Sequence, residues 1–268
     1  MSLPFLPSDA AMLALQAGVV AAPRIAPGTQ RLQRLSGRGW ALVPIASIVV
    51  VVFAIRYVSD TATGLTYLAL VAVPLLAAAA LGWASHGAKP LAALLVAPLF
   101  ALAWAEHGSL VGQASGAILS ALSCVTLGVL LGAVTPTAWL KVGIVLMAGA
   151  DAWLVIADLL QAPNAALIAA HPGGLPKLQS ETFGSVTMGY GDLFVAALLG
   201  AVMVSDGQRQ RSAAVLTLLL AGAFDLLFFV VNELPATVPV ALALIVVEAV
   251  SAVRRRSTRA DATPRLAR

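Results

Sequence analysis

Charged, aromatic and cysteine residues are all scarce in this chain. Of its 268 residues, 10% are charged, 6% are aromatic and only one, Cys124, is a cysteine. A soluble domain is about a quarter charged, so the low charge excludes a water-soluble enzyme or a disordered chain as the main body. A single cysteine excludes an intramolecular disulfide and a cysteine-cluster metal site. The low aromatic content argues against an outer-membrane barrel, which carries aromatic girdles.

Apolar residues are abundant where charged residues are scarce. They make up 60% of the chain, and the mean hydropathy is +0.95. About 160 apolar residues suffice for roughly eight membrane helices of about 20 residues each. We therefore expect an all-α polytopic membrane protein, a bundle of eight or nine transmembrane helices. Runs long enough to cross a bilayer cover residues 41–58, 64–84, 89–106, 111–133, 137–160, 185–206, 212–232 and 235–253.

The first 40 residues allow two interpretations. Residues 3–22 are apolar but contain prolines, Asp9 and Gln16, and they lack the basic start of a signal peptide. They fit either an interfacial helix or an imperfect ninth span. The expected organisation is this 1–40 segment, a four-helix part over 41–133, a second transmembrane part over 137–253 and a basic cytoplasmic tail over 254–268.

Basic residues are distributed unequally between the two sides of this predicted topology. With a cytoplasmic C-terminus, the outer side receives only Arg56 and Lys177, and Lys141 snorkels inward from its helix. The asymmetry predicts a multi-pass protein of the plasma (inner) membrane, whose tails contact membrane lipids rather than nucleic acid. The inner side receives Arg24, Arg31, Arg34, Arg38, Lys89, Arg209, Arg211, Arg254, Arg255, Arg256, Arg259, Arg265 and Arg268.

A few carboxylates fall inside the predicted spans, where ionisable residues are costly and usually functional. Asp151 lies nine residues before the outer end of its helix, and Asp192 about seven residues after the outer end of the next. Both are then roughly 10–14 Å below the outer surface. Two carboxylates at one depth on adjacent helices can share a proton and activate a water. Asp158 and Asp225 are secondary candidates, and Glu248 is expected at the solvated inner interface.

The residues around Asp192 form a short motif, Gly189-Tyr190-Gly191-Asp192. Two glycines before the acid remove side-chain bulk, so a substrate backbone can approach. With Asp151 in the preceding helix and Pro235-Ala236-Thr237 opening the last one, the order of motifs resembles the GxGD intramembrane aspartyl proteases of the presenilin and signal peptide peptidase family. The resemblance covers residues 137–253. It implies a presenilin-like arrangement of helices.

The resemblance assigns a role to each of these residues. It makes Asp151 and Asp192 the catalytic pair, and Gly189, Tyr190 and Gly191 the residues that shape the cleft. Pro235 and Ala236 would brace the site and hold a substrate, which in this family is a transmembrane helix. No metal or cofactor is implied. Two positions depart from the family pattern: Ala150 replaces a tyrosine, and Thr237 replaces the leucine of Pro-Ala-Leu.

Other interpretations use the same residues. Thr187-Met188-Gly189-Tyr190-Gly191-Asp192 looks like a potassium-channel filter, although only about 14 apolar residues follow it, too few for a separate inner helix. Prepilin peptidases also carry Met-Gly-Tyr-Gly-Asp, and in that reading Asp158 replaces Asp151. A transporter or a non-catalytic scaffold stays open because Asp225 adds a third carboxylate at similar depth. The three histidines show no metal-ligand spacing.

Overall fold

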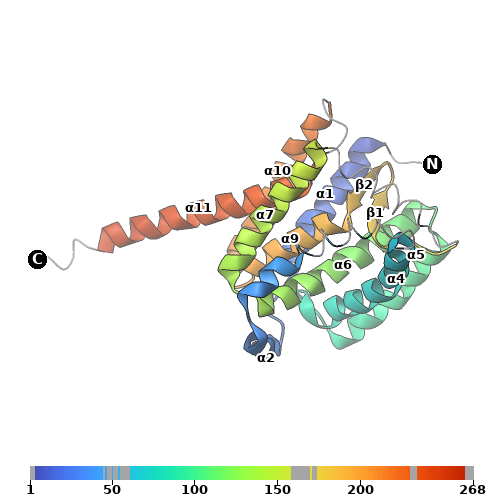
Figure 1. Ribbon diagram of the computed structural model, residues 1–268, viewed down its shortest axis with the longest axis horizontal. Coiled ribbons are helices and arrows are strands. Elements are labelled where there is room, and N and C mark those ends of the chain that lie inside the picture. Colours follow the sequence, from blue (N-terminus) through green and yellow to red (C-terminus); the bar gives the residue numbers. More distant parts are fainter. Residues whose placement is uncertain are drawn as a thin grey trace, which may run out of the picture.

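The computed structural model describes residues 4–44, 46, 50, 54, 61–157, 170, 174–229 and 234–262. These residues form helices and one β-hairpin (Figure 1). The α-helices are α1 (Phe5–Ala21), α2 (Thr29–Leu32), α4 (Thr61–Ala79), α5 (Val96–Ala105), α6 (Leu110–Val134), α7 (Thr137–Ile156), α9 (Tyr190–Met203), α10 (Gly207–Asp225) and α11 (Thr237–Ala262). Short 3-10 or π-helical turns are η1 (Gln33–Leu35), η2 (Arg38–Leu42), η3 (Ala80–Ala84), η4 (Pro90–Leu95) and η5 (Leu226–Phe229).

Four of the described helices are long and apolar enough to cross a membrane: Thr61–Ala84, Leu110–Val134, Thr137–Ile156 and Thr237–Arg255. Each coincides with a run predicted from the sequence. The predicted run 89–106 becomes η4 and α5, and the run 212–232 becomes the end of α10 followed by η5. Most of the run 41–58 lies outside the described residues. The total of eight or nine spans stays a prediction.

Helix α9 forms the centre of the bundle and contacts α1, α6, α7, α10 and α11. Its closest neighbour is α6, because small residues line both helices where they meet. A Cβ atom added to Gly128 would lie 2.8 Å from the backbone carbonyl of Ala197, and one added to Gly132 would lie 3.2 Å from the Cβ of Ala201. Small residues spaced four apart let two helix backbones approach, as membrane helices commonly do. Nine of the 14 residues of α9 are buried as a result.

Helix α1 lies inside the bundle, packed on α6, α9 and α10. Met12, Gln16 and Val20 are almost completely buried. A Cβ on Gly200 of α9 would lie only 2.3 Å from the carbonyl oxygen of Val20, so the two backbones nearly touch. Helix α1 is therefore packed on its neighbours over residues 5–21, and both interpretations of the 1–40 segment, an interfacial helix or an imperfect span, stay predictions. With 17 residues, α1 is shorter than the four long helices.

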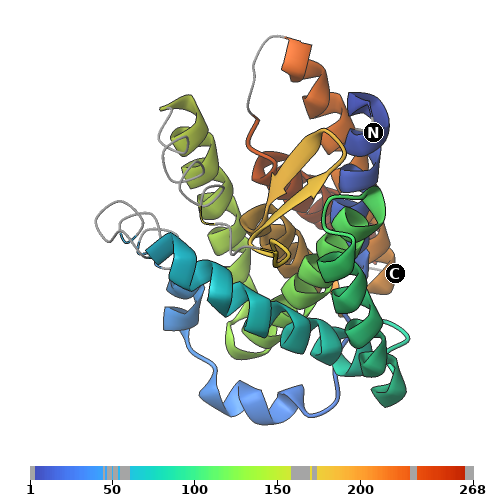
Figure 2. The ribbon, with the colours of Figure 1, turned by 90° about the vertical axis from the view of Figure 1, so that its right-hand side faces the viewer.

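A two-stranded antiparallel hairpin replaces the first turns of the predicted helix 185–206. Strand β1 (Ser180–Phe183) pairs with β2 (Val186–Gly189), and α9 begins directly afterwards at Tyr190 (Figure 2). The turn is made at Gly184, whose φ of 61° suits glycine. Threonine, phenylalanine and valine in the strands favour extended backbone. The prediction of an all-α fold is therefore wrong at this segment.

The helix ends gather into two groups, as the alternating topology predicted. At one end, which we call the hairpin end, Ser8 Oγ accepts from the Ser185 N–H and Gln113 Oε1 accepts from the Gly184 N–H. At the opposite end, which we call the basic end, Arg24 Nε donates to the Trp83 carbonyl. Residues assigned to one membrane face thus lie together. Which end faces the cytoplasm stays a prediction.

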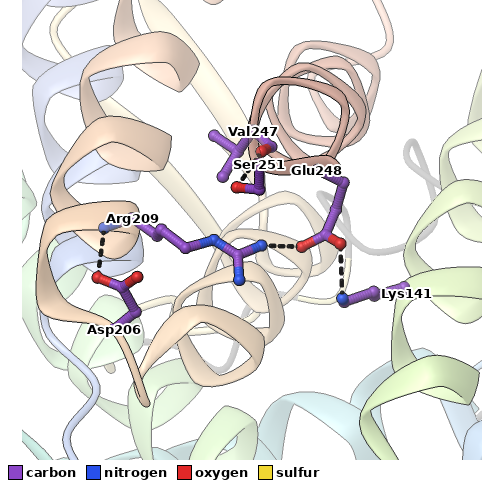
Figure 3. Close-up of polar contacts among 6 residues, drawn as sticks. All are labelled: Lys141, Asp206, Arg209, Val247, Glu248 and Ser251. Carbon is purple, nitrogen blue, oxygen red and sulfur yellow. Dashed lines mark hydrogen bonds and ion pairs between the residues drawn. The ribbon is translucent and has the colours of Figure 1, made fainter. Parts of the chain in front are cut away.

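Glu248 joins three helices at the basic end (Figure 3). Its Oε2 accepts from Lys141 Nζ of α7 at 2.9 Å, and its Oε1 accepts from Arg209 Nη2 of α10. The Asp206 carboxylate caps α10 by accepting from two backbone N–H groups. Lys141 and Glu248 are both partly exposed, and the ion pair adds a partner that the sequence did not indicate for either residue.

Helix α11 continues beyond the bundle. It runs for 26 residues to Ala262 and projects away from the other helices (Figure 1). The boundary predicted at residue 254 therefore falls inside a continuous helix. The basic segment begins as an extension of α11, with Arg254 and Arg255 exposed.

The contact between α6 and α9 generates a stability prediction. Gly128→Ala places a methyl group against the Ala197 backbone, so the helices must separate. We expect a loss of about 1–3 kcal/mol, the usual cost of overpacking. Thermal unfolding of the protein in detergent micelles measures it.

Gly64→Ala in α4 is the matched control, because nothing lies within 4 Å of the added Cβ. Alanine there gains helix propensity of up to about 1 kcal/mol. Equal unfolding temperatures for the two variants would contradict the close approach of α6 and α9.

Candidate active site

Asp151 and Asp192 come from α7 and α9, two helices in direct contact. The two carboxylates are close enough for the charge of Asp151 to act on Asp192. Each side chain is partly buried. The helices that carry the two expected residues are therefore neighbours, and the catalytic pairing itself stays a prediction. Figure 1 shows α7 and α9 side by side.

Asp151 is held by the first residue of α11. The Thr237 hydroxyl donates to Asp151 Oδ2 at 2.6 Å, and Thr237 is 5% exposed. The sequence showed this threonine only as a departure from leucine in a Pro-Ala-Leu pattern. A leucine has no donor, so the substitution supplies a hydrogen bond that the expected residue lacks. Thr237 thus holds the Asp151 carboxylate through its hydroxyl and its backbone N–H.

Asp192 is the third residue of α9, not the seventh of a longer helix. Its Oδ2 accepts from the backbone N–H of Gly189, the residue that caps the helix, at 3.0 Å. A carboxylate in the first turn also interacts favourably with the positive end of the helix dipole. The hairpin that displaces the helix start thus fixes the position of the Asp192 side chain.

The residues between the cap and Asp192 are arranged asymmetrically. Tyr190 is turned to α6, where its hydroxyl and that of Ser123 are 2.7 Å apart and the Cys124 thiol donates to its carbonyl. Gly191 is exposed, and a Cβ there would meet nothing within 4 Å. A Cβ on Gly189 would lie 3.1 Å from Asp192 Oδ2. Tyr190 therefore anchors the motif, while Gly191 leaves open space beside the carboxylate.

The segment Pro235–Thr237 is tied to the first helix of the chain. Gln16 Nε2 of α1 donates to the carbonyl of Ala236 at 3.0 Å. Gln16 is fully buried. The bond holds the start of α11 against α1, one residue before Thr237 reaches Asp151. Gln16 thus helps to fix the chain next to the site by holding Ala236. The sequence alone shows Gln16 only as an unfavourable polar group in an apolar stretch.

Of the two secondary candidates, Asp225 and Asp158, the structure describes only Asp225. Asp225 is hydrogen-bonded to Asp9 of α1, so it forms a second acid pair at the hairpin end. Asp158 lies outside the described residues. The prepilin-type pairing of Asp158 with Asp192 therefore stays a prediction.

The segment that looks like a potassium filter adopts two kinds of secondary structure. Thr187 and Met188 pair with Thr182 and Glu181 in the hairpin, and Tyr190–Asp192 form the first turn of α9. A carbonyl-lined filter requires an extended loop that directs its carbonyls at the ion. A β-ladder followed by a helix turn differs from that geometry.

A buried carboxylate lies in the hairpin. Glu181 in β1 is 2% exposed and is hydrogen-bonded to Ser120 of α6. Its Oε1 atom has no hydrogen-bond partner among the described residues. Burial raises the pKa of Glu181 to about 7, because the charged form is disfavoured away from water. Sequence position alone placed this glutamate in a polar loop, where it would be solvated.

Comparison of the chain with protein-family models, with curated proteins and with solved structures gives no match. Paired carboxyl groups, each with one oxygen held by a hydrogen bond and with open space beside Gly191, are suited to proton transfer and to activation of a water.

Replacing Thr237 tests the bond that holds Asp151. Thr237→Val keeps the shape of the side chain and the backbone N–H but removes the hydroxyl that donates to the partly buried carboxylate of Asp151. We expect a loss of about 1–3 kcal/mol. Thr237→Ser, which keeps the hydroxyl, should unfold close to the wild-type temperature. Equal destabilisation by valine and serine would indicate that the methyl packing matters rather than the hydrogen bond.

The raised pKa of Glu181 predicts that the stability of the protein depends on pH. Its pKa in the folded state, about 7, exceeds the unfolded value of 4.5, so the folded state binds the extra proton. Stability from this group is fully present below about pH 4.5 and is lost as the pH rises through 7. Glu181→Gln should therefore stabilise the protein at pH 8, by about 3 kcal/mol at most, and change little at pH 4.

The control for this measurement is Glu106→Gln, which replaces an exposed glutamate at the end of α5. It should leave the unfolding temperature nearly unchanged at both pH values. A pH profile that is the same for wild type and Glu181→Gln would contradict the assignment.

Proposed function

We propose that this protein is an intramembrane aspartyl endopeptidase that hydrolyses peptide bonds in transmembrane segments, in the manner of signal peptide peptidases. Asp151 and Asp192 are the catalytic pair. The observation that carries the proposal is the placement of these two carboxylates on contacting helices, each held by a hydrogen bond, with an exposed glycine beside Asp192 that leaves space for a substrate backbone.

The proposed chemistry follows from two carboxyl groups that share one proton. The ionised member takes a proton from a water as its oxygen attacks the peptide carbonyl carbon, while the protonated member donates to the carbonyl oxygen. The tetrahedral intermediate then collapses: the C–N bond breaks and the amine nitrogen leaves with a proton from the pair. Water supplies the hydroxyl of the new acid, and no metal or cofactor takes part.

The length of α9 supports a site below the membrane surface. Fourteen residues span about 21 Å, whereas the hydrocarbon core of a bilayer is about 30 Å thick. A helix that ends at the basic face therefore begins several ångströms inside the opposite face. Asp192 lies in that first turn. Residues 186–189 form strand β2 and not a helix turn, and the shorter helix α9 leads to a depth similar to the one predicted from the sequence.

The hairpin supports the handling of an unwound substrate. A helical peptide has its carbonyls bonded internally, so a membrane segment must unwind locally before it is cut. Among the described residues, β1 and β2 pair only with each other. A free strand edge offers backbone donors and acceptors to an extended peptide. Strand β2 ends at Gly189, whose N–H holds Asp192, so a peptide on that edge leads to the site.

The proposed location is the plasma (inner) membrane, with the C-terminus in the cytoplasm. The gathering of basic residues at one end of the bundle supports this orientation, because such residues stay on the cytoplasmic side. The hairpin and the acid pair then face outward. Substrates are transmembrane helices of the kind that signal peptide peptidases accept.

The test is cleavage of a reporter membrane helix in liposomes that contain the full chain. Asp151→Asn and Asp192→Asn keep an oxygen that accepts from Thr237 or Gly189, so both variants should fold. Each should lower the cleavage rate about 10³-fold or more, because general acid–base catalysis is lost. Products are identified by mass spectrometry.

Asp225→Asn is the matched control, because it changes the acid pair with Asp9 and should leave cleavage near the wild-type rate. A rate that falls equally in all three variants would point to lost stability rather than lost chemistry. Cleavage that persists in Asp151→Asn and Asp192→Asn would contradict the proposal.

A further inference from the structure

A short connecting segment, residues 25–42, crosses the basic end of the bundle. It contains α2, η1 and η2, which are four, three and five residues long. A helix needs about 20 residues to cross a bilayer, so these turns are too short to span it. The Gly37 N–H donates to the carbonyl of Val134, the last residue of α6, at 3.0 Å. Figure 1 shows α2 beside the ends of α6 and α7 that lie away from the hairpin.

Residues 29–35 of this segment carry three kinds of side chain in a fixed order. Helix α2 and the turn η1 follow each other without a break, and every third residue of such a turn lies on the same face. The faces carry Gln30 with Gln33, Arg31 with Arg34, and Leu32 with Leu35. One face is thus polar and neutral, one is basic and one is apolar. A surface divided in this way fits the boundary between water and lipid.

The apolar side chains of the segment are exposed. Ile25, Leu35 and Leu42 are 68%, 63% and 63% exposed, and Trp40 is 42% exposed. Contact of these side chains with water would be unfavourable. The arginines between them, in turn, would be costly inside the hydrocarbon core. The headgroup layer satisfies both requirements, because it is charged on its outer side and borders the acyl chains on its inner side.

The arginines of the segment favour a negatively charged partner. Arg31, Arg34 and Arg38 are exposed. Among the residues that the structure describes, no carboxylate pairs with them, since both ion pairs belong to Glu248. The guanidinium of Arg38 lies over the ring of Trp139, 6.0 Å from its centroid. A guanidinium can donate two parallel hydrogen bonds to a phosphate group, which makes phosphate a good match for these side chains.

Three of the five tryptophans of the chain contact this segment. Trp40 Nε1 donates to the Leu35 carbonyl at 3.0 Å, and Trp83 Nε1 donates to the Pro27 carbonyl at 2.8 Å. The third is Trp139 of α7, beneath Arg38. Tryptophan gathers at membrane–water boundaries, because its ring is apolar and its N–H is polar. The basic end therefore carries the aromatic residues that are typical of a bilayer surface.

We propose that residues 25–42 form an interfacial platform, which lies flat in the headgroup layer at the basic end and binds anionic phospholipids. Leu35 and Leu42 enter the boundary with the acyl chains, and Arg31, Arg34 and Arg38 donate to lipid phosphates. The platform does not rest on the proposed function, because it is built from residues outside the carboxylate site. It also differs from diffuse attraction of a basic tail, because it assigns a depth to particular side chains.

The first test places a dansyl fluorophore on Leu35→Cys or Leu42→Cys of the full chain, in liposomes of equal parts phosphatidylcholine and phosphatidylglycerol. The natural cysteine, Cys124, is buried and should not react. Lipids brominated near the headgroup end of the acyl chain should quench the fluorescence at both positions, and aqueous iodide should not. This result is expected because interfacial apolar side chains lie about 5–10 Å into the headgroup and acyl boundary.

Two labelled positions are matched controls for depth. Gln33→Cys lies on the neutral face, and iodide should quench it several-fold more than position 35. Leu75→Cys lies in the span Thr61–Ala84 and is 67% exposed, so lipids brominated deep in the chain should quench it. Iodide quenching at positions 35 and 42 as strong as at position 33 would show that the apolar face meets water or a soluble partner, and would overturn the proposal. Energy transfer between proteins labelled at position 35 would show that a second copy covers the face, and would overturn it too.

The second test measures the preference for anionic lipid at the same place. Brominated phosphatidylglycerol should quench position 35 more than brominated phosphatidylcholine at the same mole fraction. Arg31→Gln together with Arg34→Gln should lower this excess about fivefold or more, because each basic residue near a membrane surface attracts anionic lipid by about that factor. Arg31→Lys with Arg34→Lys keeps the charge and should keep most of the excess. An excess that is absent in the parent protein, or unchanged in the glutamine variant, would overturn the proposal.

Discussion

The close approach of α6 and α9 is the constraint on which the rest of the structure depends. Two pairs of small residues, Gly128 with Ala197 and Gly132 with Ala201, bring the helix backbones together. Lipid offers little hydrophobic driving force between membrane helices, so packing of this kind has to supply much of the association. Because α9 then lies at the centre of five helices, its first turn and Asp192 have a fixed place relative to every one of them.

Polar bonds from distant parts of the chain complete the site on this frame. Gln16 holds Ala236, Thr237 holds Asp151 and Ser123 contacts Tyr190. Each joins segments that are far apart in sequence. Each also gives a partner to a polar group that would otherwise be unsatisfied in an apolar interior. The site is thus a convergence of α1, α6, α7, α9 and α11, with the hairpin setting where α9 begins.

The sequence predicted the features that depend on periodic or bulk properties. Long apolar runs located the four spanning helices, and the alternation of basic residues placed the helix ends in two groups. The placement of Asp151 and Asp192 on neighbouring helices followed from motif order and from the antiparallel course of consecutive helices. In each case the signal is local or additive, so no knowledge of packing was needed.

Features that depend on a particular partner were not predictable in this way. The sequence predicts a loop and a helix start over residues 180–189, because short apolar segments fit helix and strand equally well. The sequence marks Gln16 as an unfavourable polar residue, and only the structure shows that it bonds Ala236. It likewise does not show that Glu248 pairs with Lys141 and Arg209. In the sequence, Thr237 is only a departure from the Pro-Ala-Leu motif. The structure shows that its hydroxyl donates to Asp151.

The two attachments between α7 and α11 have a mechanical consequence. Thr237 and Glu248 are eleven residues apart on α11, and Asp151 and Lys141 are ten apart on α7, so the contacts are about 15 Å apart on antiparallel helices. Sliding one helix by a turn would break both at once. The two bonds therefore fix the register of α7 against α11, and with it the height of Asp151 relative to the start of α11.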